Sequence, residues 1–82
     1  MLDVKVLGSG CPNCKRLEAE ARAALDEMGV PYMISKVTEY DQIMAYGVMS
    51  TPALVINEKV VSAGRVLGKA RIIELARQFE SA

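Results

Sequence analysis

Two cysteines separated by two residues are the side chains of this sequence best suited to chemistry. They are Cys11 and Cys14, and Pro12 and Asn13 lie between them. On the first turn of a helix, residues three positions apart lie close enough for a disulfide, whose Cα atoms are about 4.4–6.8 Å apart. Such a pair can exchange its disulfide with another molecule, or its two thiolates can hold a soft ion such as copper(I).

The position of each cysteine predicts that the two thiols differ in reactivity. Cys11 is expected at the N-terminus of a helix, where unpaired N–H groups and the helix dipole stabilise a thiolate. Lys15 and Arg16 add positive charge in the first turns. Cys14 lies further along, on the apolar face with Leu17, and is expected to be more buried and less ionised. Cys11 is therefore the more reactive thiol in this hypothesis.

The absence of histidine narrows the chemistry open to the chain. It excludes Ser–His and Cys–His catalysis and every imidazole metal ligand. A complete zinc site would need two further ligands from another chain or from solvent. Small copper chaperones also carry C-x-x-C before a helix, but they usually have a Met before the first cysteine, where this chain has Ser9 and Gly10. A copper- or zinc-binding chaperone, or a redox sensor, is the alternative to disulfide exchange.

Length and charge bound the class of protein. With 82 residues, the chain is expected to form a single domain over residues 1–82. Ten basic residues balance ten acidic ones, so neither nucleic acid nor an anionic membrane is an expected partner. No stretch approaches the roughly 20 apolar residues of a membrane helix, and no apolar signal region follows Lys5. We therefore expect a cytoplasmic protein, in a compartment where thiols are kept reduced.

The elements that must position the cysteines follow from periodicity. Residues 3–7 predict a short strand, and residues 8–10 interrupt it. A helix then begins near Pro12, which suits a first helical turn, and ends at Gly29. Glu18 is expected on its solvated face, and the sequence identifies no proton acceptor for the second cysteine. The apolar positions recur at three- and four-residue steps: Cys14, Leu17, Ala21, Ala24, Leu25 and Met28.

Three more strands and two more helices are expected in the rest of the chain. The strands are residues 32–37, 53–56 and 59–63, with a turn at Asn57 and Glu58 between the last two. The final helix runs from about residue 68 to residue 80 and has an apolar stripe made of Ile72, Ile73, Ala76 and Phe79. The order is β-α-β-α-β-β-α, which begins with a parallel right-handed crossover and ends with an antiparallel hairpin before the last helix.

A short helix between the second and third strands is predicted from Thr38, which with Asp41 resembles an N-cap. This helix would end at Gly47 and carry three apolar side chains inward: Tyr40, Ile43 and Met44. Core packing is the expected role of three methionines of the chain, namely Met28, Met33 and Met44.

Two segments of the sequence resemble one family. GSGCPNCK at residues 8–15, followed by an amphipathic helix, resembles the redox motif of the thioredoxin superfamily. YGVMSTPALVIN at residues 46–57 resembles the segment of that fold that carries a cis proline. The length and element order are similar to those of the small glutaredoxin-like thioredoxins, also called redox-active disulfide proteins. The resemblance implies an α/β minimal thioredoxin fold, with a four-stranded mixed sheet flanked by three helices, two on one face and one on the other.

The same resemblance implies a role for each residue of the site. Cys11 is the nucleophile and Cys14 the resolving thiol of a thiol–disulfide oxidoreductase that acts as a reductase. Thr51 and a cis Pro52 face the cysteines, and the Thr51 backbone pairs with an extended substrate in a form of strand addition. Further substrate contacts are expected from the Pro12-Asn13 dipeptide.

The resemblance also implies the partners of the reaction. One is a disulfide-containing protein or small molecule, and the other is an electron donor, either a reductase or a low-molecular-weight thiol. No bound cofactor and no metal ion is expected within the chain. Tyr46 and Met49, near the Thr51–Pro52 loop, are expected to line the substrate groove, and Gly64 matches the small residue that follows the last strand.

Overall fold

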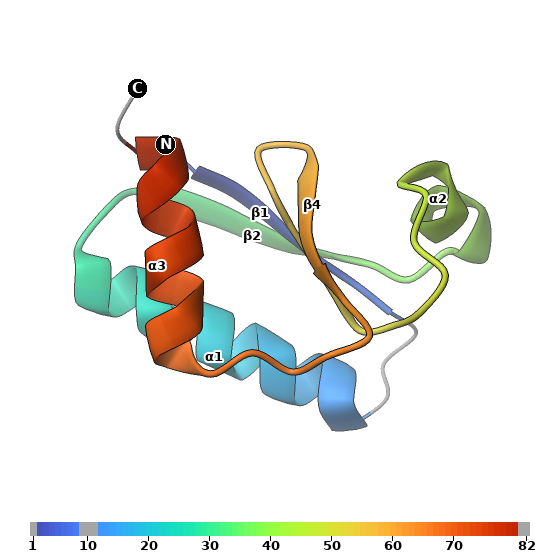
Figure 1. Ribbon diagram of the computed structural model, residues 1–82, viewed down its shortest axis with the longest axis horizontal. Helices are drawn as coiled ribbons and strands as arrows, with labels where there is room; N and C mark the ends of the chain where they lie inside the picture. Colours follow the sequence, from blue (N-terminus) through green and yellow to red (C-terminus); the bar gives the residue numbers. More distant parts are fainter. Residues whose placement is uncertain (1, 9–11, 81–82) are drawn as a thin grey trace.

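The order of elements is the one that the sequence predicts. A computed structural model describes residues 2–8 and 12–80 (Figure 1). Seven elements follow one another along the chain: β1 (Leu2–Leu7), α1 (Pro12–Met28), β2 (Tyr32–Val37), α2 (Tyr40–Ala45), β3 (Ala53–Ile56), β4 (Lys59–Ala63) and α3 (Lys69–Glu80). Within these residues, no helix is long and apolar enough to cross a membrane.

The four strands form one mixed sheet in the order β2-β1-β3-β4. β1 pairs with β2 in parallel, and the pairs β1–β3 and β3–β4 are antiparallel. The parallel pair is joined by α1, because parallel neighbours need a crossover connection. The predicted fold class, an α/β minimal thioredoxin fold, is confirmed.

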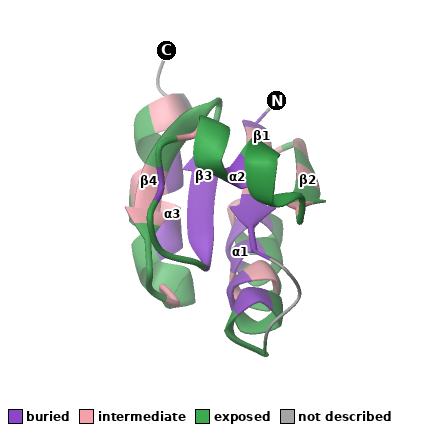
Figure 2. Cartoon of the chain, turned by 90° about the vertical axis from the view of Figure 1, so that its right-hand side faces the viewer, coloured by how far each residue is buried: buried purple, intermediate pink, exposed green. Residues whose placement is uncertain are grey.

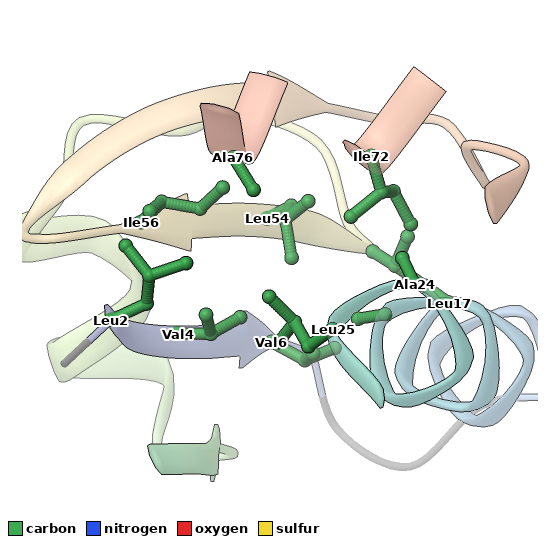
Figure 3. Close-up of a cluster of buried hydrophobic side chains, with 11 residues drawn as sticks. Leu2, Val4, Val6, Leu17, Ala24, Leu25, Leu54, Ile56, Ile72 and Ala76 are labelled. Carbon is green, nitrogen blue, oxygen red and sulfur yellow. The ribbon is translucent and has the colours of Figure 1, made fainter. Parts of the chain in front are cut away.

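Alternation along the central strand divides the core between the two faces of the sheet. Val4 and Val6 of β1 point toward α1 and α3, whereas Leu7 points to the other face and packs with Ile43 of α2. β3 is buried along its whole length, in contrast to the largely exposed α2 (Figure 2). The larger cluster joins β1, β3, α1 and α3 (Figure 3), and its labelled members include Leu2, Val4, Val6, Leu17, Leu25, Leu54, Ile56, Ile72 and Ala76.

Local sequence signals account for the ends of the elements. Pro12 is the first residue of α1, and Gly29 follows its end with a φ of 69°, a left-handed conformation that glycine adopts readily. Asn57 and Glu58 both have positive φ, as a two-residue hairpin turn requires. The Asn57 side chain also accepts a hydrogen bond of 3.0 Å from the backbone N–H of Asp3, which ties the hairpin to β1.

Two predictions about α2 are wrong. Its N-cap residue is Glu39, not Thr38, and no side chain caps the first turn. Ile43 is its only buried residue, while Tyr40 and Met44 are 72% and 45% exposed. The reason is that α2 has only six residues, so a single side chain on its inner face reaches the sheet.

One prediction about β2 is also wrong, since Met33 is 62% exposed and is not part of the core. Met33 shares its face of the sheet with Val37, because side chains two residues apart on a strand point the same way. Val37 packs against the smaller cluster around Ile43. That face is covered by α2 alone, which leaves Met33 open. Met28, by contrast, packs against the larger core as predicted.

Candidate functional site

The resolving cysteine of the predicted pair is buried at the start of α1. Cys14 is 5% exposed, which confirms the expectation that it lies on the apolar face of the helix. Pro12 and Asn13, the first two residues of α1, are exposed. Cys11, Ser9 and Gly10 lie outside the described residues.

The backbone of Gly8 makes room for the Cys14 sulfur. Gly8 follows β1 and is anchored by a hydrogen bond of 2.9 Å from its N–H to the carbonyl oxygen of Val37. A Cβ atom at this position would overlap Cys14 Sγ and would lie 3.8 Å from Cβ of Thr51. The sequence indicates Gly8 only as the end of a strand. This position requires glycine because the sulfur of Cys14, on α1, approaches the backbone closely.

The loop before β3 approaches the same glycine. The Thr51–Pro52 peptide bond is cis, as the resemblance implies. Pro52 is buried, and its carbonyl oxygen accepts a hydrogen bond of 2.8 Å from the N–H of Gly64. Thr51 is exposed and lies beside Gly8. The structure therefore brings Cys14 and Thr51 together next to Gly8.

Gly64, just after β4, is a second place where the backbone requires glycine. Its φ is 75°, and a Cβ atom there would lie 3.0 Å from Cβ of Ser50. Any other residue would combine a strained backbone with a crowded contact to the loop that carries Thr51. Gly64 thus packs against the loop that carries Thr51, at the position that the resemblance singles out.

A small cavity beside Cys14 is lined by charged groups. Its volume is about 10 Å³, and its lining consists of Val6, Gly8, Cys14, Lys15, Glu18 and Lys36. The expectation that Glu18 lies on a solvated face is wrong, because its side chain is only 15% exposed. The sequence shows that Glu18 lies four residues after Cys14. It does not show that Lys36 of β2 lies against the same part of the helix.

Two cations hold the Glu18 carboxylate. One oxygen lies 3.2 Å from Lys36 Nζ, and the other accepts hydrogen bonds of 3.0 and 3.2 Å from the Arg22 guanidinium. Burial by itself would raise the pKa of Glu18, but the hydrogen bonds from Arg22 and Lys36 outweigh it and leave the pKa below its usual value. Glu18 is therefore ionised at neutral pH.

Thr51 also lines an apolar hollow. Its volume is about 200 Å³, and its lining consists of Thr38, Tyr40, Ile43, Met44, Val48, Met49, Ser50 and Thr51. Met49 is 94% exposed, and the exposed Tyr40 and Met44 stand beside it. Exposed apolar side chains gathered at one place are typical of a binding surface.

Tyr46 does not line this hollow, which corrects the expectation from the sequence. Its hydroxyl accepts a hydrogen bond of 3.0 Å from Lys5 Nζ and donates one of 3.1 Å to a Glu58 carboxylate oxygen, and Lys5 also pairs directly with Glu58. The hydrogen bonds to Glu58 and then Tyr46 raise the pKa of Lys5. This cluster joins the end of α2 to the hairpin turn after β3 and is not part of the site around Cys14.

The fold and the site together define a thioredoxin-fold protein, in which a C-x-x-C segment opens a helix beside a loop with a cis proline. Comparison with known proteins gives the family. Residues 2–77 match the model of the thioredoxin domain. A thioredoxin of Methanothermobacter thermautotrophicus is 36% identical over 72 residues, which cover 88% of this chain and 94% of that protein. A thioredoxin of Methanocaldococcus jannaschii is 27% identical over 79 residues, which cover 96% and 91%.

The chain therefore belongs to the thioredoxin family. Thioredoxins in general exchange thiols and disulfides, act on disulfide substrates and are served by reductases. Membership supports thiol–disulfide oxidoreduction as the general function of this chain.

Proposed function

We propose that this protein reduces disulfides of other proteins or of small molecules, with Cys11 as the nucleophile and Cys14 as the resolving thiol. The observation that carries the proposal is the burial of Cys14 against Gly8, with the exposed Thr51 next to the same glycine. A buried second thiol suits resolution within the protein, since only a sulfur already attached next to it can be attacked.

The reaction consists of two thiol–disulfide exchanges. The Cys11 thiolate attacks one sulfur of the substrate disulfide, and the other substrate sulfur leaves with the electron pair of the broken bond. Cys14, as thiolate, then attacks Cys11 Sγ and displaces the second substrate sulfur. The substrate has gained two electrons, and the protein carries a Cys11–Cys14 disulfide. A reductase or a low-molecular-weight thiol in the cytoplasm returns the two electrons, and no bound cofactor takes part.

The surroundings of Thr51 provide the surface for the substrate. An extended substrate segment pairs with the Thr51 backbone, and the exposed Pro12 and Asn13 contact it from the start of α1. The apolar hollow lined by Met44 and Met49 accepts a side chain next to the substrate disulfide. Thr51, Pro12, Asn13, Met44 and Met49 are all exposed before the substrate arrives.

Turnover of a protein disulfide tests the proposal. With dithiothreitol as electron donor, the native chain should accelerate reduction of a protein disulfide, and Cys11→Ser should abolish the acceleration. A separate titration with copper(I) against a chelator measures metal binding. Tight binding that requires both cysteines, without any disulfide turnover, would favour the metal-binding alternative and contradict the proposal.

A further inference from the structure

The resolution step requires that Cys14 lose its proton, since a thiolate and not a thiol is the nucleophile. An ordinary thiol has a pKa of about 8.5, so most of it is protonated at neutral pH. Cys14 is 5% exposed, which leaves bulk water little access to its sulfur. A group within the protein that can take the proton would therefore speed this step.

Glu18 is the carboxylate that shares a cavity with Cys14. The two residues are four positions apart on α1 and therefore lie on the same side of the helix. Both line the cavity of about 10 Å³, a size close to the smallest that holds one water molecule. A carboxylate has about four lone-pair directions. The contacts to Lys36 and Arg22 leave capacity for a further hydrogen bond.

The charges around the cavity keep this carboxylate ionised. From α1, Lys15 lines the cavity and Arg22 binds Glu18; from β2, Lys36 does both. β1 and the residue after it contribute only Val6 and Gly8, which carry no charge. A half-buried carboxylate without cations would bind a proton more readily, and with its proton it could not accept another.

We infer that Glu18 accepts the proton of Cys14 during resolution, directly or through one water molecule in the cavity, while Lys36 and Arg22 hold the carboxylate in place. The inference rests on the proposed function. As the proton moves to Glu18, the Cys14 sulfur bonds to Cys11 Sγ, and the bond from Cys11 Sγ to the substrate sulfur breaks. The substrate sulfur leaves with that electron pair and receives a proton from Glu18 or from water.

The size of the effect follows from the strength of the base. General bases accelerate a reaction by a factor of about 10²–10⁴, and the most effective ones have a pKa near the working pH. Glu18 is a weaker base than that, because its cationic neighbours lower its pKa. We therefore expect an effect of about tenfold, below the lower end of this range.

An aromatic disulfide that releases a coloured thiolate separates the two steps in a stopped-flow experiment. In excess, it reacts with Cys11 and releases one thiolate, and the attack by Cys14 releases the second. In Glu18→Gln the first release should stay within about twofold of the native rate, whereas the second should slow about tenfold near pH 7. The gap should narrow as the pH rises above the ordinary thiol pKa of about 8.5, because hydroxide then competes with Glu18 for the thiol proton.

Glu27→Gln is the matched control. Glu27 lies on the same helix and pairs with Lys69 at 2.8 Å, but it does not line the cavity beside Cys14. Its substitution should change neither release. Glu18→Asp, which keeps a carboxylate, should be slowed less than Glu18→Gln, and it also guards against a change caused only by lost packing.

A second thiolate release that is not slowed in Glu18→Gln would point to a different role for Glu18. If Glu18 acted only through its charge, its removal would favour the Cys14 thiolate and accelerate the second release. A second release in Glu18→Gln that is unchanged or faster near pH 7, or equal slowing by Asp and Gln, would overturn the inference and leave the proposed function intact. If the native protein gave no second release, the proposed function itself would fail.

Discussion

At the scale of single residues, the Cys14 sulfur on α1 explains why residue 8, after β1, is glycine. The Cys14 sulfur occupies the space where a side chain on Gly8 would begin. Thr51 lies next to the same space, since its Cβ would be 3.8 Å from the added carbon. The position of the Cys14 sulfur therefore requires glycine at position 8, because every other residue has a Cβ atom.

Gly8→Ala should displace Cys14 and slow its attack on Cys11. The added carbon overpacks the site, which costs about 1–3 kcal/mol of stability. We expect a lower midpoint in urea unfolding and a slower second release of the coloured thiolate, with a smaller effect on the first. Gly68→Ala is the control, since no heavy atom lies within 4 Å of the space that its Cβ would occupy. Equal behaviour of the two variants would contradict this account of Gly8.

At the scale of elements, α2 and the loop that follows it form an apolar surface beside the site. A helix of six residues covers little of the sheet, and the side chains that it does not bury remain available to a partner. Tyr40 and Met44 come from the helix, and Met49 comes from the loop. The element that contributes least to the core thus supplies much of the surface next to Thr51.

Met49→Ser should weaken the use of protein substrates more than the chemistry. Burying a methionine side chain is worth about 1.5–3 kcal/mol, so partial burial in a complex predicts a KM that is raised several-fold. The kcat and the reduction of a small disulfide should change little. Met33→Ser is the matched control, because Met33 is also an exposed methionine but lies on β2 away from the hollow. A KM raised equally by both substitutions would show that Met49 has no specific role.

The sequence predicts the bounds of the helices and strands better than it predicts the contacts between them. The strands at residues 32–37, 53–56 and 59–63 have the predicted bounds, because β-branched runs and the Asn57-Glu58 turn are local signals. The sequence does not predict the low exposure of Glu18, because its partner Lys36 lies on another element. The exposure of Tyr40 and Met44 likewise depends on how much of the sheet α2 covers, which no local pattern encodes.

At the scale of the whole molecule, the two faces of the sheet are packed unequally. α1 and α3 cover one face and enclose the larger core, while α2 alone packs on the other (Figure 1). The start of α1, the end of β1 and the loop before β3 converge at Gly8. The site is therefore built on the well-packed core, and the apolar hollow beside it lies on the less covered face.

The central claim is that Cys11 attacks the substrate and Cys14 releases it. The most direct test incubates Cys14→Ser with a protein that contains one accessible disulfide and measures the intact mass of the products. We expect a stable adduct of one partner, linked through Cys11 in the peptide map and removed by dithiothreitol, because serine is too weak a nucleophile to resolve it. Cys11→Ser should form almost none. An adduct that forms equally through Cys14, or no adduct with either variant, would contradict the account.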